Sequence, residues 1–140
     1  MDRESDAGRW SWVTSEQALS ISLGLQGPCV IARLTGDFDF GSAAEVRDRV
    51  TKALDLTQPP MLVIDMQAVS VCDSSGLSVL VYLHKAVTAS GGRLLLSGLN
   101  GRCEHLFAIT ALDKFFDIRR TAELAIAELN EEGNAPPYPA

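Results

Sequence analysis

The residues best suited to chemistry stand together in one short segment, where Asp73, Ser74 and Ser75 lie between an apolar run and a helical pattern. Asp and Ser are preferred at helix N-caps because their side chains accept hydrogen bonds from the partnerless amides of the first turn. One cap needs a single such side chain. A hydroxyl just inside a helix start is exposed at the positive end of the helix dipole, which favours a phosphate. The segment therefore indicates either capping alone or a serine that a kinase phosphorylates.

Catalysis by these serines is the main alternative, and the sequence disfavours it. The chain has no G-x-S-x-G motif, and His84 lies about 13 Å along the helix from Ser75, so we expect it at the edge of the core. His105 could approach the same sheet edge, but no defined orienting acid accompanies it. Metal binding by Cys103 and His105 has no second ligand pair. Because Gly98–Gly101 lacks the lysine and hydroxyl of a P-loop, it predicts a turn. We expect no enzyme, no metal and no cofactor.

A second polar segment, Gly36–Gly41, places two carboxylates and two aromatic rings between a predicted strand and a predicted helix. The carboxylates of Asp37 and Asp39 could orient a basic side chain of a partner. Phe38 and Phe40 either belong to the core or, where a ring faces solvent beside Asp39, form part of a protein-binding edge.

The elements that must position these segments follow from hydrophobic periodicity. Alternating apolar residues over Leu19–Leu25, followed by Gly27-Pro28 and a second apolar run, predict an antiparallel strand pair. The segment Ser42–Leu54 predicts a helix with its serine as N-cap and Glu45 as the capping-box partner. Met61–Ile64 is a continuous apolar run, which is typical of a central parallel strand covered on both faces.

The second half of the chain alternates strands and helices. Asp73 and Ser74 are the expected caps of a helix that Gly91-Gly92 ends. The later elements are a strand over Arg93–Ser97, a helix over Cys103–Thr110, a strand over Phe115–Ile118 and a helix over Thr121–Leu129 capped by Thr121. This order predicts an α/β fold with one mixed sheet, an antiparallel first strand pair, a largely parallel interior and about four helices. Loops at the carboxyl ends of its parallel strands gather at one edge, where partners usually bind.

Length and charge bound the class of protein. At 140 residues the chain fits one domain, which we expect over residues 18–130, with a flexible extension at 1–17 and a flexible tail at 131–140. Twelve Lys and Arg against 18 Asp and Glu give a net charge of -6, which disfavours nucleic acid as a partner. No apolar stretch reaches the ~20 residues of a membrane span. With no secretory signal, we expect a cytoplasmic protein whose three cysteines are reduced.

From Ala18 to Leu129 the chain resembles a STAS domain of the anti-sigma factor antagonist family. Residues 30–44, VIARLTGDFDFGSAA, resemble the family's strand, acidic turn and helix start. Residues 61–77 resemble its buried strand and D-S-S-G-L phosphorylation loop. The residues Gly91-Gly92-Arg93-Leu94, Leu106-Phe107 and Thr110-Ala111-Leu112-Asp113 also fall in the family's order.

The resemblance implies a protein that switches partners and catalyses nothing. Ser75 is then the phosphoacceptor, and the partner-binding residues are Asp37, Asp39, Phe40, Asp73, Ser74, Ser75, Gly76 and Leu77. The unphosphorylated form, a monomer when free, binds an anti-sigma factor with serine kinase activity and so frees a sigma factor for transcription, as in stress responses. Phosphorylation releases the complex, and a serine phosphatase resets the cycle. A non-switching STAS interaction subunit of a transporter or signalling assembly is the alternative.

Two positions depart from the family pattern. Cys72 stands where a larger apolar residue is frequent, and Ala111 stands where a glycine commonly follows the helix. If Ala111 adopts the left-handed conformation, this costs ~1 kcal/mol or more.

Overall fold

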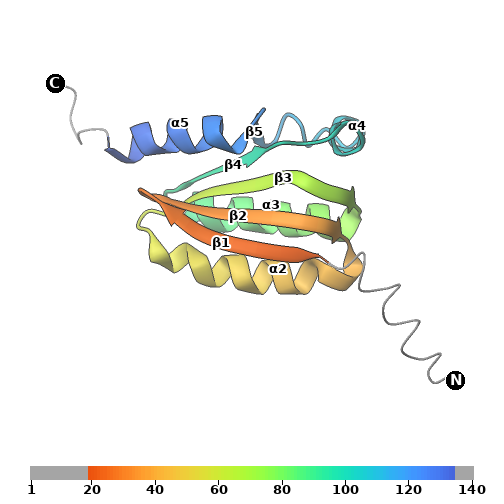
Figure 1. Ribbon diagram of the computed structural model, residues 1–140, viewed down its shortest axis with the longest axis horizontal. Coiled ribbons are helices and arrows are strands. Elements are labelled where there is room, and N and C mark those ends of the chain that lie inside the picture. The colour runs from red at the N-terminus through yellow and green to blue at the C-terminus, as the bar shows by residue number, and fades with distance from the viewer. Residues whose placement is uncertain (1–18, 135–140) are drawn as a thin grey trace, which may run out of the picture.

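Five strands form one sheet in the order β1-β2-β3-β4-β5 in the computed structural model, which describes residues 19–134 (Figure 1). β1 pairs antiparallel with β2, and the other three pairings are parallel, which confirms the predicted mixed α/β sheet. The described elements are β1 (Ser20–Gln26), β2 (Cys29–Phe38), α2 (Phe40–Ala53), the short 3-10 helix η1 (Leu54–Leu56), β3 (Met61–Cys72), α3 (Ser74–Ala89), β4 (Arg93–Ser97), α4 (Gly101–Ile109), β5 (Asp117–Arg119) and α5 (Ala122–Asn134).

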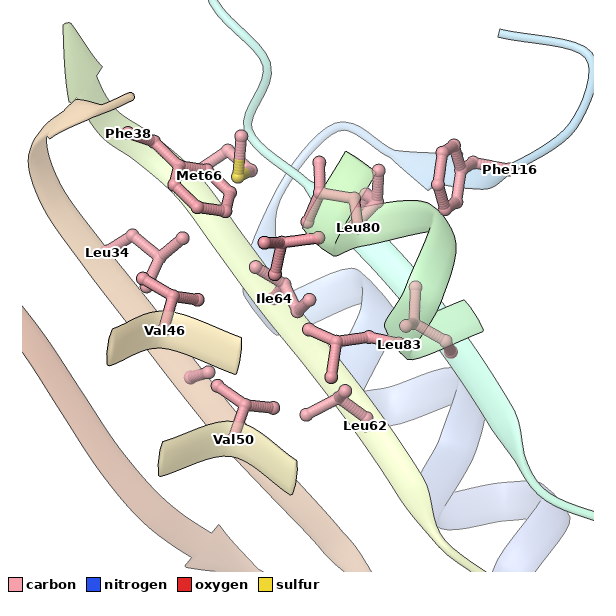
Figure 2. Close-up of a cluster of buried hydrophobic side chains, with 14 of the residues drawn as sticks. Leu34, Phe38, Val46, Val50, Leu62, Ile64, Met66, Leu80, Leu83 and Phe116 are labelled. Carbon is pink, nitrogen blue, oxygen red and sulfur yellow. The ribbon is translucent and has the colours of Figure 1, made fainter. Parts of the chain in front are cut away.

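The sheet has a hydrophobic core on each face because side chains alternate along its buried strands. Leu34, Ile64 and their neighbours face α2 and α3, where Val46 and Leu80 pack against them (Figure 2). On the other face, α5 covers a smaller cluster that includes Val63. Burying one such side chain stabilises the fold by about 1.5–3 kcal/mol. The larger core therefore fixes α2 and α3, whose N-termini follow β2 and β3.

The predicted cap of α2 is wrong. The helix begins at Phe40 rather than after Ser42, and Asp39 is its N-cap. The Asp39 carboxylate accepts a hydrogen bond from the Gly41 amide at 3.0 Å, while the Asp39 amide donates to the Ser42 hydroxyl at 3.1 Å. Ser42 is thus the second member of a capping box, a place that the sequence pattern assigned to Glu45. Asp39 and Ser42, three residues apart, both suit the cap, and the extended backbone of Asp39 selects the first.

Other element bounds differ from the predicted ones, although the element order is confirmed. β3 continues past Ile64 to Cys72. β5 begins only at Asp117, because the preceding Phe115 and Phe116 lie in a turn in which both amides donate to the Leu112 carbonyl. Thr121 caps α5 as predicted, by accepting from the Leu124 amide at 3.2 Å, and the helix runs beyond the predicted end to Asn134. The predicted extension at 1–17 lies outside the described residues, as do residues 135–140.

Ala111 has the left-handed backbone conformation, with φ of 62°. A side chain there collides with its own carbonyl, so we expect Ala111→Gly to raise the free energy of unfolding by about 1 kcal/mol. Ala108→Gly is the matched control, because Ala108 lies in the last turn of α4, where replacing alanine by glycine lowers helix propensity and costs up to about 1 kcal/mol. Urea denaturation of both variants measures the two effects. Destabilisation by both substitutions would contradict the account of Ala111.

Candidate functional site

The two polar segments that the sequence singles out meet at the carboxyl ends of β2 and β3. The strands are parallel neighbours, and Phe38 pairs with Cys72 at their last position. The Asp73 amide donates to the Phe38 carbonyl at 3.3 Å, and the Phe40 amide donates to the Asp73 carboxylate at 3.2 Å. These two bonds join segments that lie more than 30 residues apart in the sequence, and they make the two segments one site.

Asp73 holds this site together through both oxygens of its carboxylate. Asp73 is the N-cap of α3, and one carboxylate oxygen accepts hydrogen bonds from the amides of Ser75 at 2.9 Å and Gly76 at 3.1 Å. The other accepts from Phe40, the first residue of α2. The two helix N-termini are therefore fixed to one side chain, and the local positive potential of both dipoles is directed at the same place.

The two serines differ in exposure. Ser74 is exposed and is the first residue of α3, whereas Ser75 is half-buried at the second position. Within the loop the hydrogen bonds engage the Asp73 carboxylate and backbone amides, and among residues 19–134 none engages the hydroxyl of either serine. Asp73, rather than Ser74, is the cap.

Gly76 and Leu77 lie beneath the loop. A Cβ on Gly76 would lie 2.7 Å from the Phe38 carbonyl oxygen and 3.1 Å from the Cys72 sulfur, so only glycine allows this close approach. Leu77 is 7% exposed and belongs to the core on the α2 and α3 face. The sequence analysis assigned both to partner binding, and the structure places both among the buried residues. Both residues support the loop from inside.

The two aromatic residues of the acidic turn, Gly36–Gly41, lie in different environments. Phe38 is fully buried, whereas Phe40 is 83% exposed. Asp37 and Asp39 are half-buried beside it. Asp39 is also the N-cap of α2, so its carboxylate has a structural role in addition to any contact with a partner. Of the two aromatic rings, Phe40 is therefore the one that faces solvent beside Asp39.

The site continues along the adjacent surfaces of α2 and α3, a feature that the sequence analysis missed. The guanidinium of Arg47 lies 4.1 Å from the centre of the Tyr82 ring, which places these helix faces side by side. Helical spacing puts Arg47 in line with Phe40, and Tyr82 in line with Ser75. We call this set the α2–α3 surface; its members are Phe40, Ala44, Arg47, Ser75, Ser78 and Tyr82. The spacing was visible in the sequence, but the contact between the helices was not.

Within residues 19–134, neither histidine hydrogen bonds to the serines of the loop. His84 packs against Phe115, with ring centres 4.4 Å apart, and against Phe116 at 5.5 Å. It lies at the core edge, as predicted. His105 is exposed on α4. In the part of the chain that the structure describes, no three His, Cys, Asp or Glu side chains are grouped to hold a metal ion.

The glycine-containing segment after β4 is a helix cap. Asn100 accepts from the Cys103 amide at 2.8 Å, and its side-chain amide donates to the Val69 carbonyl at 2.7 Å. Asn100 thereby fixes α4 to β3 close to the site. The segment is a capped turn, in agreement with the sequence prediction.

Burial governs the chemistry of the nearby thiol. It raises the pKa of Cys72 to about 12, with smaller contributions from Cys103 and the Asp73 carboxylate. The thiol therefore stays protonated at neutral pH and is a poor nucleophile. None of the three cysteines, Cys29, Cys72 and Cys103, forms a disulfide bond. Between residues 19 and 134 no helix combines the length and apolar character needed to cross a membrane.

Comparisons with known proteins agree with this geometry. The model of the STAS domain family matches residues 20–125. An anti-sigma-B factor antagonist of Bacillus subtilis (strain 168) is 36% identical over 90 residues, which cover 64% of this chain and 81% of that protein. The anti-sigma factor antagonist SpoIIAA in its unphosphorylated form has a TM-score of 0.68 at 20% identity, covering 84% of this chain and 100% of that chain.

A second structure is that of the Bacillus cell fate determinant SpoIIAA in its phosphorylated form. It has a TM-score of 0.61 at 20% identity, and the match covers 78% of this chain and 98% of that chain. At this level of identity both structural matches show a shared fold.

Proposed function

The chain belongs to the STAS domain family, and from this premise we propose that it is an anti-sigma factor antagonist whose binding is switched by phosphorylation of Ser75. The unphosphorylated form binds an anti-sigma factor that has serine kinase activity, and phosphorylation releases the complex. The observation that carries the proposal is the joint between the two helix starts, where Asp73 hydrogen bonds to Ser75 of α3 and to Phe40 of α2. A modification at Ser75 thus falls beside an exposed aromatic ring suited to binding a partner.

Ser75 is favoured over Ser74 by its place on the helix. Ser75, Ser78 and Tyr82 recur at the spacing of one helix face, and the contact of Tyr82 with Arg47 directs that face toward α2. A phosphate on Ser75 therefore lies within the α2–α3 surface. Ser74, one residue earlier, turns about 100° away from that face at 3.6 residues per turn. Modification of Ser75 consequently affects a partner on this surface more strongly.

The switch acts through local charge. A phosphoserine adds about 1.5 to 2 negative charges at pH 7, next to the Asp73 carboxylate, which accepts from the Ser75 amide at 2.9 Å. The N-terminus of α3 tolerates an anion, so the domain itself has little reason to refold. A partner bound at this surface would have to remove water from the phosphate and tolerate its charge, and both requirements lower the affinity of the complex.

The biological consequence is partner switching. Capture of the anti-sigma factor frees a sigma factor for transcription, phosphorylation of Ser75 ends the capture, and a serine phosphatase restores the binding form. The chain itself catalyses no step in this cycle. Support comes from the curated relative named as an anti-sigma-B factor antagonist and from the free hydroxyl at the start of α3.

Phosphate incorporation tests the proposal. We expect the anti-sigma factor encoded in the same genome, with ATP, to phosphorylate the protein at one serine, which mass spectrometry of the peptides assigns to Ser75. Ser75→Ala should abolish the labelling. Ser74→Ala is the matched control and should retain it, because Asp73 and not Ser74 caps α3. Full labelling of the Ser75→Ala variant, at Ser74 or Thr121, would refute the assignment. A lack of labelling in the wild type would favour a non-switching interaction subunit.

Asp39 gives a separate prediction about affinity. We expect Asp39→Asn to weaken binding of the anti-sigma factor about tenfold, because a hydrogen bond to a charged group contributes roughly 1.5–3 kcal/mol. The fold should lose little stability, since Asn caps helices about as well as Asp. Asp55→Asn removes the same charge at the other end of α2 and should leave affinity unchanged. Calorimetric titration and thermal unfolding separate the two effects. Lower stability with unchanged affinity would show that Asp39 acts only as a cap.

A further inference from the structure

β1 leaves one edge of the sheet unpaired in residues 19–134, because it is the outermost strand and pairs only with β2. Its sequence, Ser-Ile-Ser-Leu-Gly-Leu-Gln, contains neither a charge nor a proline. Proteins normally protect an exposed edge with lysine, proline, a bulge or a covering segment, since free backbone groups invite pairing with another strand. β1 contains neither lysine nor proline, and its regular pairing with β2 shows that it has no bulge.

An apolar groove lies beside this edge, between β1 and the end of α2. It has a volume of about 290 Å³ and is lined by Leu23, Gly24, Leu25, Val30, Ala53 and Leu56. Two of its leucines are unusually open, with Leu25 55% and Leu56 63% exposed. Covering them would remove apolar surface from water at about 25 cal/mol per Å². The groove and the edge therefore favour the same kind of occupant, an extended strand with large apolar side chains.

The chain itself carries such a segment directly before β1. Residues 10–14 read Trp-Ser-Trp-Val-Thr, an alternating pattern typical of a strand. We propose that this segment, Trp10–Thr14, pairs antiparallel with β1 as a sixth strand and covers the groove with its tryptophan rings. Thr14 then pairs with Leu19, the residue before β1, and the four residues Ser15–Ala18 form the loop, a length that is common in hairpins. Trp12 then lies opposite Ile21, and Trp10 lies opposite Leu23.

The face of the sheet supports this register. Ile21 and Leu23 pack against the core on the α2 side, while Ser20 and Ser22 between them are exposed. Residues opposite each other in an antiparallel pair share a face, so both tryptophans fall on the α2 side, next to the groove. Each ring can bury about 150–250 Å² there. Ser11 falls opposite Ser22 on the open face. The polar and apolar patterns match at these three pairs, whereas Val13 falls opposite the exposed Ser20 and Thr14 falls opposite Leu19.

The backbone of β1 agrees with the same register. The two-residue turn Gly27-Pro28 makes Gln26 and Cys29 the pair that closes the hairpin with β2. Since hydrogen-bonded and non-hydrogen-bonded positions alternate, the amides and carbonyls of Ile21, Leu23 and Leu25 point to the open edge. Those of Ile21 and Leu23 are the groups that Trp12 and Trp10 would meet. The proposal therefore differs from the flexible extension that composition alone predicts for residues 1–17.

Tryptophan fluorescence tests the placement, because Trp10 and Trp12 are the only two tryptophans of the chain. We expect the emission of the full-length protein to be blue-shifted from that of free tryptophan. Leu56→Glu puts a charge in the groove and should shift the emission toward the free position. Leu124→Glu is the matched control, since Leu124 is 56% exposed on α5 across the sheet, and it should leave the emission unchanged. Circular dichroism verifies that both variants fold.

Amide hydrogen exchange provides the second readout on the same full-length protein. Slow exchange at the amides of Ile21 and Leu23 in a monomer is the expected result. Exchange as fast as in an unpaired chain would overturn the proposal, as would blue-shifted emission that Leu56→Glu does not alter. If the slow amide exchange depends on protein concentration and the molar mass in solution is doubled, a second copy of the chain pairs with β1. That result would also overturn the proposal. None of these outcomes depends on binding of an anti-sigma factor.

Discussion

Ser75→Asp is expected to weaken binding of the anti-sigma factor by about a hundredfold. The substitution puts a permanent negative charge at the start of α3, within the α2–α3 surface. Against one acidic group of a partner ~6 Å away, at an effective dielectric constant of ~20, one added charge costs roughly 3 kcal/mol before salt screening. A loss of that size corresponds to about a hundredfold in affinity. Titration calorimetry with the anti-sigma factor at moderate salt measures it.

Ser75→Asn separates charge from size in this experiment. Asparagine has nearly the volume of aspartate and no charge, so we expect it to bind much more tightly than the aspartate variant. Raising the salt concentration should narrow the difference, because screening weakens the repulsion. Equal losses in both variants would show that the half-buried position rejects any larger side chain and that charge is not the cause.

Phe40→Ala should weaken the same complex about thirtyfold. Binding hot spots are enriched in aromatic side chains near the centre of an interface, and their truncation costs at least about 2 kcal/mol. Phe40 is 83% exposed in the free protein, so its removal creates no cavity and should leave the unfolding temperature almost unchanged. Its amide still donates to Asp73, because that contact uses the backbone.

Leu124→Ala is the control for this substitution. Leu124 is also an exposed apolar side chain, but it lies on α5, which covers the opposite face of the sheet (Figure 1). We expect its truncation to leave affinity unchanged. Equal affinity of the Phe40→Ala variant and the wild type would remove Phe40 from the binding surface and would place the contacts elsewhere on the molecule.

Much of the fold was predictable because hydrophobic periodicity is local. Two elements were identified correctly as strands, one from the alternation of Leu19–Leu25 and one from the continuous apolar run of Met61–Ile64. The end of α3 was predicted from Gly91-Gly92. Alternation could also have assigned Phe38 to the core, since it shares a parity with Leu34 along β2, and both are buried. Phe40 has the same parity, so alternation alone would not have shown that its ring is exposed; it belongs to α2, where the strand period no longer applies. The pattern was present, but it crosses Gly36 and Asp37, where polar residues interrupt the apolar signal.

Element bounds were harder to predict because they depend on competition between similar side chains. Asp39 and Ser42 both suit the cap of α2, and their reciprocal hydrogen bonds, which use both residues, decide the outcome. Phe115 and Phe116 read as the start of a strand because aromatic residues favour strands. Their amides are instead held by Leu112, and Phe116 is buried in the core.

The site depends on contacts that no local pattern contains. The hydrogen bond between Phe40 and Asp73 requires β2 and β3 to be parallel neighbours that end at one level. The contact of Arg47 with Tyr82 likewise requires α2 and α3 to lie side by side. Sequence reasoning named the two polar segments separately, and the sheet topology joins them. The fold also buries Gly76 and Leu77, which local patterns could not show.

The affinity of one anti-sigma factor for two forms of the wild-type protein tests the central claim most directly. The protein is prepared unmodified and with phosphate on every Ser75, both verified by mass spectrometry, and each form is titrated with the anti-sigma factor under identical conditions. The account predicts tight binding of the unmodified form and binding at least about a hundredfold weaker for the phosphorylated form. Equal affinities of the two forms would contradict it.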